Sequence, residues 1–247
     1  MSCAVFSLGL HDSLSAFATF DWTASQKIAA EDAPTRLQQR DAIIIHVVPF
    51  SAFDKMISLP LTDVYNLYPR FPPLGGTTQH FGINLDGLLT LSNAQRNAPT
   101  RAYVQVFRSG IVEAVSSILM GDGSPEKPRR ATSMQTECYI VGGTHQYIRQ
   151  LIELGCDPPF AVLVTLIAVK GMPYTFSSVA RNVFEFDLES GTLDRDQLYF
   201  SEVIIEALPP DPYEYANLLR PLFDEIANAA GRHATVSFEN GRFGYRI

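Results

Sequence analysis

The sequence predicts an α+β fold, with a mixed, mostly antiparallel sheet that includes a β-meander and has two main helices packed on it. Two successive pairs of strand-like stretches, each pair joined by a short turn signal, predict the meander. Two longer stretches with apolar residues at helical spacings predict the helices. We expect residues 25–247 to form a single domain, preceded by a weakly patterned N-terminal tail at residues 1–24.

The first strand is expected at residues 42–48, which are β-branched or apolar apart from His46. A run that is apolar on both faces is typical of a central strand, and Pro49 ends it. Residues 57–78 follow, with four prolines, two glycines and no periodicity. A connection of this length is unusual in a compact domain, so we expect it either to be functional or to lie over the surface.

The meander is expected next in the chain. Asp86-Gly87 is a strong hairpin dipeptide, and Ser109-Gly110 is a second turn signal. These turns separate four expected strands, at residues 82–85, 88–92, 101–107 and 111–115.

The first main helix is expected to begin at Thr132, whose side chain forms a capping box with Gln135. Apolar residues then recur at spacings of four and three, and Gly155 fits the C-terminal cap. The resulting stripe consists of Cys138, Val141, His145, Ile148 and Ile152.

Residues 160–169 are the most apolar run of the chain and are expected to form a second central strand. Weaker strand patterns follow at residues 183–188 and 200–207. We expect the core to be built on apolar positions of the strands and helices, namely Ile43, Ile45, Val47, Val104, Val106, Ile148, Val162, Val164, Leu166 and Leu222.

The second main helix is expected to begin after Asp211, with Pro212 in its first turn. Pro221 cannot donate a backbone hydrogen bond, so we expect the helix to kink or restart there. A terminal hairpin is expected to turn at Asn240-Gly241.

Composition narrows the class of protein. Hydrophobic residues make up 46% of the 247 residues and charged residues 18%, which excludes a disordered chain. The longest apolar run, roughly ten residues, is too short to span a bilayer. The first twenty residues contain no Lys or Arg, so no secretory signal is expected. Three cysteines without a close pair form no disulfide framework. Because unpaired cysteines suit a reducing compartment, we expect a cytoplasmic protein.

No motif of a known chemistry is present, and we expect no cofactor, no metal ion and no catalytic residue. The five histidines have no metal-ligand spacing. His46 is expected to be a hydrogen-bonded core residue rather than a general base. Cys138 and Cys156 are expected to be small core residues, the alternative being a reactive Cys138 thiol paired with His145.

Five stretches of the chain follow a familiar order, at residues 43–49, 84–87, 103–115, 151–166 and 221–231. Together they resemble the C-terminal region of bacterial proteins whose N-terminal half is a Schlafen-type, Alba-like domain. Those proteins are often labelled ATP-binding or DNA-binding. The resemblance spans residues 25–232 and leaves out the Alba-like half. It implies an accessory domain of a nucleic-acid-linked bacterial system, and it assigns no catalytic residue to this region.

The leading hypothesis is a non-catalytic regulatory or interaction domain. The resemblance implies that its partner is another protein or an Alba-like domain, covalently linked or adjacent. Aromatic and arginine side chains, which are common at interface hot spots, gather in residues 57–78 beside the Asp86-Gly87 hairpin. The alternative for each ring is that it holds a long connection on the core. The candidate binding residues are Tyr65, Tyr68, Arg70, Phe71, Asn84, Asp86 and Arg108.

Two other hypotheses come from different classes of protein. A hydrolase acting on a nucleotide or nucleic acid would need acids and a histidine to converge, and His46 with Asp54, or Asp86 with Arg108, are the best pairs. The second hypothesis is a pocket that senses a nucleotide without turning it over.

The charge distribution argues against tight nucleic-acid binding by this chain alone. The net charge is −7, and residues 185–214 hold nine acidic residues and one basic residue. The one basic cluster, Lys127, Arg129 and Arg130, offers about two or three phosphate contacts. The acidic segment suits a basic partner surface instead.

Overall fold

The structure is a computed structural model that describes residues 26–28, 33–53, 58–95, 97–118, 129–177 and 189–247. Within these ranges the fold is α+β with a mostly antiparallel sheet, as predicted. The expected tail at residues 1–24 and the expected strand at residues 183–188 lie outside the described residues.

Eight strands form the main sheet: β1 (Ala42–Pro49), β2 (His80–Ile83), β3 (Gly87–Leu91), β4 (Ala102–Phe107), β5 (Val112–Ser116), β7 (Phe160–Ile167), β10 (Gln197–Tyr199) and β11 (Val203–Ile205). Their order is β10-β7-β1-β5-β4-β3-β2, and β11 also pairs with β7. Every pairing in this sheet is antiparallel. The two runs predicted as central strands, β1 and β7, are interior, and β2 to β5 form the predicted meander.

Two smaller sheets complete the strands. β6 (Ala131–Thr132) pairs in parallel with β8 (Pro173–Phe176), which pairs antiparallel with β9 (Glu189–Thr192). The predicted terminal hairpin is confirmed as β12 (Phe238–Glu239) and β13 (Arg242–Phe243). The two residues between them have φ angles of 50° and 77°, the left-handed region that Asn and Gly tolerate.

Both main helices begin where the capping signals predict. α3 (Ser133–Glu153) follows Thr132, whose hydroxyl accepts from the Gln135 N–H at 3.3 Å. α4 (Pro212–Ala229) follows Asp211, whose carboxylate caps the first turn. Of the two outcomes expected at Pro221, the restart is wrong, because α4 is one helix through that residue, and the kink stays a prediction. The missing N–H there removes one backbone bond, and the buried apolar face of α4 maintains the helix.

The long connection at residues 57–78 contains more regular structure than its sequence indicates. α2 (Leu61–Asn66) and a 3₁₀ turn, η2 (Tyr68–Arg70), lie within it, and Phe71 and Leu74 are buried. A helix of six residues is too short to display apolar periodicity, which is why the pattern did not reveal it. A second 3₁₀ turn, η1 (Phe50–Phe53), follows β1.

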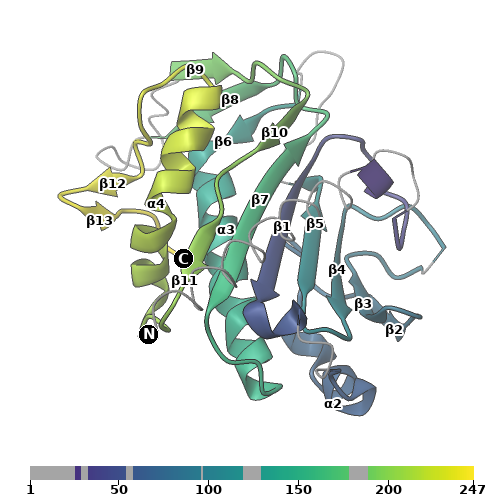
Figure 1. The fold of residues 1–247 in the computed structure, drawn as a ribbon. Coiled ribbons are helices and arrows are strands. Elements are labelled where there is room, and N and C mark those ends of the chain that lie inside the picture. Colours follow the sequence, from purple (N-terminus) through teal and green to yellow (C-terminus); the bar gives the residue numbers. More distant parts are fainter. Residues whose placement is uncertain (1–25, 29–32, 54–57, 96, 119–128, 178–188) are drawn as a thin grey trace.

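The core lies between one face of the main sheet and the helices α3 and α4 (Figure 1). Side chains alternate between the faces of a strand, so β1 directs Ile43, Ile45 and Val47 into this cluster and Ile44 into a second cluster on the other face. All ten predicted core residues belong to the helix-side cluster, which confirms that prediction. Among the described residues, no helix is long and apolar enough to cross a membrane.

The buried face of α3 is broader than the predicted stripe. Val141 and Ile148 are buried as expected, whereas Cys138, His145 and Ile152 are only partly buried. The reason is that α3 contacts the main sheet, the smaller sheet of β6 and β8, α4 and the segment before β2, so its buried face spans more than one stripe. The additional buried residues include Ile140, Thr144, Tyr147 and Leu151.

Replacing Val164 by Asp should abolish soluble expression. Val164 is fully buried on the helix-side face of β7, so the variant would place an unpaired carboxylate in the core. Leu208→Asp is the control, because Leu208 is 42% exposed. Recovery of folded Val164→Asp at the level of the control, measured by soluble yield and circular dichroism, would show that β7 is not central.

Candidate functional site

The hairpin between β2 and β3 is fixed by the side chain of Asn84. Its Oδ1 accepts from the N–H groups of Asp86 and Gly87, at 3.0 and 2.9 Å. Its Nδ2 donates to Gln105 Oε1 on β4 at 2.7 Å, and Gln105 Nε2 donates to Asn84 Oδ1 at 3.3 Å. These four hydrogen bonds connect the turn to the sheet, so the hairpin tip is a preorganised element.

Arg108 holds the adjoining turn against this hairpin. Its Nε donates to the Leu85 carbonyl at 3.1 Å, and its N–H donates to the Asp86 carbonyl at 2.9 Å. Its own carbonyl accepts from the Leu59 N–H at 2.7 Å. Asp86 and Arg108 therefore contact each other through their backbones, and the Leu85 side chain is 88% exposed.

Three aromatic side chains gather beside the edge strand β2. The rings of Tyr68 and Phe81 are stacked, with centroids 3.5 Å apart and planes 9° from parallel. Tyr65 on α2 lies 5.5 Å from Phe81 and 6.3 Å from Tyr68, and it is 43% exposed. These rings and the hairpin lie at the same end of the main sheet. We call Tyr65, Tyr68, Phe81 and Leu85 the sheet-end surface.

Two of the predicted binding residues have other roles. Arg70 forms an ion pair with Glu153 on α3, and its side chain is about half exposed. Phe71 is fully buried, which corrects the expectation that its ring is available to a partner. Its ring lies parallel to that of Tyr147 at 6.3 Å, and its carbonyl accepts from Thr90 Oγ1. Phe71 therefore holds the segment on the core, which is the alternative that the sequence left open.

Sequence reasoning missed Phe81 and Leu85. Phe81 lies in the strand β2, where an apolar residue indicates core, and it is partly buried against the core as well as stacked on Tyr68. Leu85 immediately precedes the Asp86-Gly87 turn, and this position was the available signal, because a tight turn directs its side chains away from the sheet.

A buried polar group lies on the sheet face opposite the helices. The register places His46 on β1 opposite Glu113 on β5, and their Nε2 and Oε2 atoms are 3.1 Å apart. The Tyr103 hydroxyl donates to Glu113 Oε1 at 2.8 Å. Burial, and then the charge of Glu113, raises the pKa of Tyr103 well above its ordinary value. His46 is fully buried and Glu113 almost so, which fits the expectation of a hydrogen-bonded core histidine.

One residue of the pairs proposed for a hydrolase, His46, is fully buried inside the sheet, and its proposed partner Asp54 lies outside the described residues. In the other pair, the Arg108 N–H donates to the Asp86 carbonyl. Burial raises the pKa of Cys138 to about 12 and that of Cys156 to about 11, so neither thiol is ionised at neutral pH. His145 packs edge-on against Tyr215, with ring centroids 5.3 Å apart. No group of three or more His, Cys, Asp or Glu side chains among the described residues could hold a metal ion.

A buried carboxyl lies in the first turns of α3. Glu137 is 1% exposed, and its Oε1 accepts from Thr235 Oγ1 at 2.8 Å. The Thr235 N–H donates to Asp224 Oδ1 on α4 at 2.9 Å. Burial raises the pKa of Glu137 to about 7, and hydrogen bonds from Ser237 and Thr235 oppose this shift. Glu137 therefore anchors the segment after α4 to α3.

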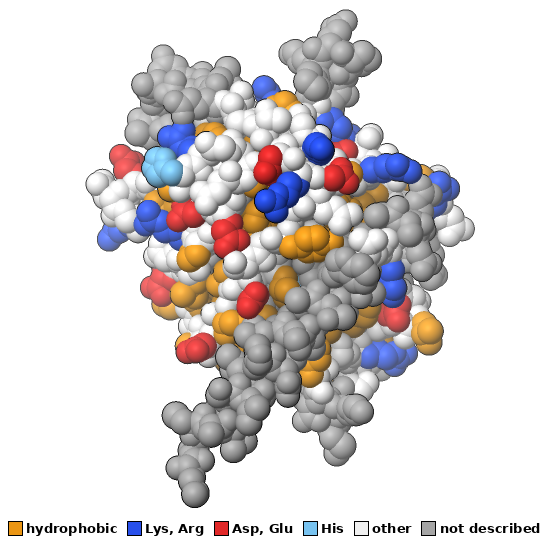
Figure 2. Space-filling view, turned by 45° about the horizontal axis from the view of Figure 1, so that its top comes forward, with side chains coloured by type: hydrophobic (Ala, Val, Ile, Leu, Met, Phe, Trp, Pro, Cys, Tyr) orange, Lys and Arg blue, Asp and Glu red, His pale blue; other side chains and the backbone are white. Residues whose placement is uncertain are grey.

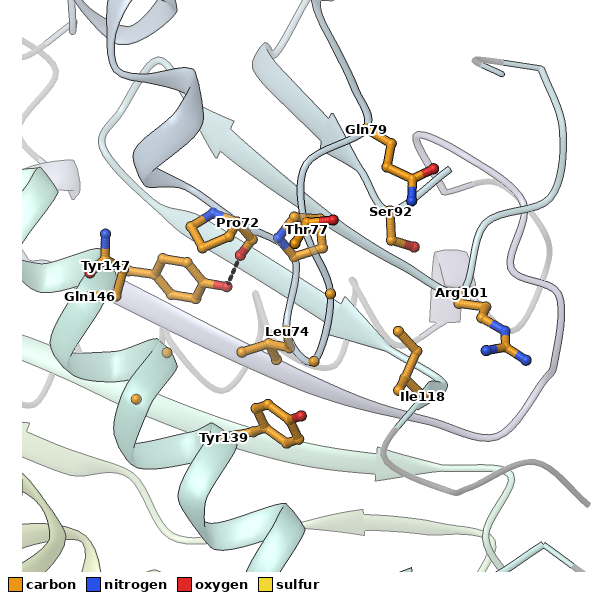
Figure 3. A pocket seen from close by; sticks show the side chains of 15 residues that line it. Pro72, Leu74, Thr77, Gln79, Ser92, Arg101, Ile118, Tyr139, Gln146 and Tyr147 are labelled. Carbon is orange, nitrogen blue, oxygen red and sulfur yellow. Dashed lines mark hydrogen bonds between the residues drawn. The ribbon is translucent and has the colours of Figure 1, made fainter. Parts of the chain in front are cut away.

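An open groove of about 650 Å³ lies between residues 72–79 and α3. Three side-chain hydrogen bonds fix the groove wall: Thr90 Oγ1 to the Phe71 carbonyl, Tyr147 Oη to the Pro72 carbonyl, and Ser116 Oγ to the Leu74 carbonyl. Figure 3 shows Tyr139 and Tyr147 on the α3 side, with Ile118 and Arg101 toward the other end. None of the seven predicted binding residues lines this groove.

The basic cluster is partly used inside the molecule. Arg129 Nε lies 2.7 Å from Asp41 Oδ2, and Arg129 Nη2 donates to the Ser117 carbonyl at 2.7 Å. Arg130 is exposed, and Lys127 lies outside the described residues. Figure 2 shows acidic and basic side chains interspersed on the viewed face. The cluster therefore offers fewer phosphate contacts than its sequence indicates.

Comparison with protein-family models, with curated proteins and with solved structures finds no significant match. The resemblance to the C-terminal region of Schlafen-type, Alba-like proteins therefore stays a prediction.

The unfolding free energy should fall between about pH 4.5 and pH 7 because of Glu137. Its pKa in the folded protein, about 7, lies above its ordinary value of 4.5, so the folded state binds this proton more tightly than the unfolded chain. The contribution is fully present below pH 4.5 and is lost as the pH rises to about 7. The shift corresponds to a loss of up to about 3 kcal/mol.

Urea unfolding of Glu137→Gln at several pH values tests this expectation. The neutral amide removes the titration, so the difference in unfolding free energy between wild type and variant should change across this window. Glu239→Gln, at an exposed position, is the control and should parallel wild type. If the unfolding free energies of Glu137→Gln and wild type change in parallel with pH, the raised pKa of Glu137 is contradicted.

Proposed function

We propose that this chain is a non-catalytic interaction domain with a regulatory role, and that its partner docks on the sheet-end surface. The observation that carries the proposal is the 88% exposure of Leu85 on a hairpin fixed by Asn84, Gln105 and Arg108. Exposed apolar side chains on a rigid element lose little conformational entropy on binding, which favours affinity.

The chemical character of the surface supports recognition. Tyr65 adds an exposed ring to the stacked pair of Tyr68 and Phe81, and tyrosine is enriched at interface hot spots. The exposed Arg70–Glu153 pair borders the same segment and would form a polar rim. An apolar centre with a polar edge is the usual anatomy of a protein interface.

The buried polar group favours binding over catalysis. General acid–base catalysis requires a titratable side chain within hydrogen-bond reach of a substrate. His46 and Glu113 bond to each other inside the sheet, and Tyr103 occupies the second carboxylate oxygen. A hydrolase built on His46 would have to open the centre of the sheet.

The resemblance supplies the class of partner. It supports a protein or an Alba-like domain, linked or adjacent, within a nucleic-acid-linked bacterial system. The acidic excess of residues 185–214 suits a basic partner. Free thiols at Cys138 and Cys156 fit a reducing compartment, so we propose the cytoplasm.

The variant with Tyr65→Ala and Leu85→Ser should bind its partner at least about tenfold more weakly, because truncating hot-spot side chains typically costs more than 1 kcal/mol each. Its melting temperature should stay within a few degrees of wild type, since both side chains are exposed. Quantitative capture against an Alba-like domain supplied in trans, and against bacterial lysate, measures the loss.

The control for this experiment is Leu218→Ser, which changes a leucine that is 41% exposed on α4. It should capture the partner like wild type. Two outcomes would contradict the assignment of the sheet-end surface. One is equal capture by wild type, the double variant and Leu218→Ser. The other is a loss of capture in Leu218→Ser as large as that in the double variant.

The chain alone should bind duplex DNA with a dissociation constant no tighter than about 10⁻⁴ M at physiological salt, the weak end of non-specific binding. The reason is the small number of available phosphate contacts, since Arg129 is engaged with Asp41. A mobility-shift series at low and physiological salt measures this. Micromolar binding that disappears in the triple variant Lys127→Ala, Arg129→Ala and Arg130→Ala would instead identify a nucleic-acid-binding module.

A further inference from the structure

We infer that the outer edge of β2 pairs with β2 of a second copy of this chain, so that the two main sheets join into one antiparallel sheet. β2 is the last strand of the main sheet, and its pairing in that sheet is with β3 on one side. Figure 1 shows β2 at the outer border of the sheet. This inference does not rest on the proposed function, because it concerns backbone groups of β2 and a second copy rather than a different protein.

One hydrogen bond at the end of β2 fixes the direction of its backbone groups. The Asn84 N–H donates to the Gly87 carbonyl at 2.9 Å, so the backbone of Asn84 is directed toward β3. Successive residues of a strand direct these groups to opposite sides, so Gly82 also faces β3, whereas Phe81 and Ile83 face away from it. Among the described residues, none hydrogen-bonds to the outward N–H and carbonyl groups of Phe81 and Ile83. Such a row of backbone donors and acceptors is a template for another strand.

The outer edge of β2 lacks the usual protection against such pairing. Natural proteins commonly block an exposed sheet edge with charged side chains or proline. The opposite border of the main sheet follows this rule, because exposed acidic residues adjoin its strands, namely Asp196 before β10 and Glu202 and Glu206 on either side of β11. β2, with the sequence His-Phe-Gly-Ile, contains no acidic residue, lysine, arginine or proline. Two copies of β2 therefore meet without repulsion between charges on the strand.

The sequence of β2 also fits the symmetry of a pair of identical chains. A two-fold axis perpendicular to the sheet makes the two strands antiparallel, and two-fold dimers are the commonest oligomers. With Gly82 on this axis, Phe81 of each copy exchanges backbone hydrogen bonds with Ile83 of the other, which satisfies every outward N–H and carbonyl of these residues. The two glycines then lie opposite each other, and a glycine inside a strand often marks the close approach of another backbone.

The side chains of Phe81 and Ile83 support the same register. Both pack partly against the helix-side core, so they lie on one face of β2. Phe81 of one copy would lie directly opposite Ile83 of the other, and aromatic and β-branched side chains form favourable cross-strand pairs. Tyr68, stacked on Phe81, would border the joined strands. Because β2 has four residues, we expect a weak and reversible dimer.

Sedimentation velocity of the full chain, from about 10 μM to about 1 mM, tests the dimer in the concentration range where a small interface associates. The weight-average mass should rise with concentration from that of the monomer toward that of the dimer. A chain that stays monomeric throughout overturns the inference. A mass beyond that of the dimer also overturns it, because a two-fold contact closes with two copies.

Ile83→Pro tests the backbone pairing. Proline removes an N–H that faces away from β3, so the bonds between β2 and β3 remain, and proline is tolerated on edge strands. Each dimer would lose two hydrogen bonds, so the affinity should fall at least about tenfold. Ile83→Val is the matched control, because it keeps the N–H and has a side chain close to proline in size. It should dimerise like wild type. Wild-type affinity in a folded Ile83→Pro protein, or an equal loss in Ile83→Val, overturns the hydrogen-bonded pairing.

Charged variants test the register without proline. In the two-fold pair, the Ile83 positions of the two copies are diagonal neighbours, within reach of long side chains. Ile83→Lys alone and Ile83→Glu alone should therefore dimerise less than wild type, because like charges repel. An equimolar mixture of the two should form a heterodimer at low salt, where opposite charges attract most. A mixture of the folded variants that dimerises no better than either alone overturns the two-fold register, including in the case that Ile83→Pro does not fold.

Discussion

The arrangement of the molecule depends on one strand that is buried on both faces and on both edges. β1 pairs along its whole length with β7 and along five residues with β5. Its odd-numbered residues contact the helices, and its even-numbered residues face the other side of the sheet. Every position of β1 is buried, so its one ionisable residue, His46, needs a partner inside the protein. The register supplies Glu113 directly opposite.

More polar side chains lie beside this pair on the neighbouring strands. Glu113 also accepts from Tyr103, and the register places Gln105 beside Glu113 on the next strand. His46, Glu113 and Tyr103 form one hydrogen-bonded group, while Gln105 belongs to a second one. Gln105 bonds to Asn84 in the hairpin turn and to the Leu88 carbonyl. These bonds connect the turn that displays Leu85 to the sheet, which explains why the exposed tip is preorganised.

The sequence predicted those features that depend on neighbouring residues. Asp86-Gly87 located a hairpin and Thr132 a helix start, because turns and caps are local. β10, with three residues, and the parallel pair β6–β8 were missed, since their pairing partners are remote in the sequence. The candidate site could be predicted only in part. Residue type and turn position singled out Tyr65 and Asn84 as candidates, whereas the groove depends on contacts between segments about 70 residues apart.

The segment around Phe71 explains how a stretch without periodicity acquires a defined shape. Consecutive parts of its backbone accept hydrogen bonds from Thr90 on β3, Tyr147 on α3 and Ser116 on β5. These donors belong to regular elements, so the sheet and the helix impose the path of the segment. Tyr68 on one side of this segment contributes to the sheet-end surface, and Leu74 on the other side lines the groove. One hydrogen-bonded segment therefore contributes to the sheet-end surface on one side and to the groove on the other.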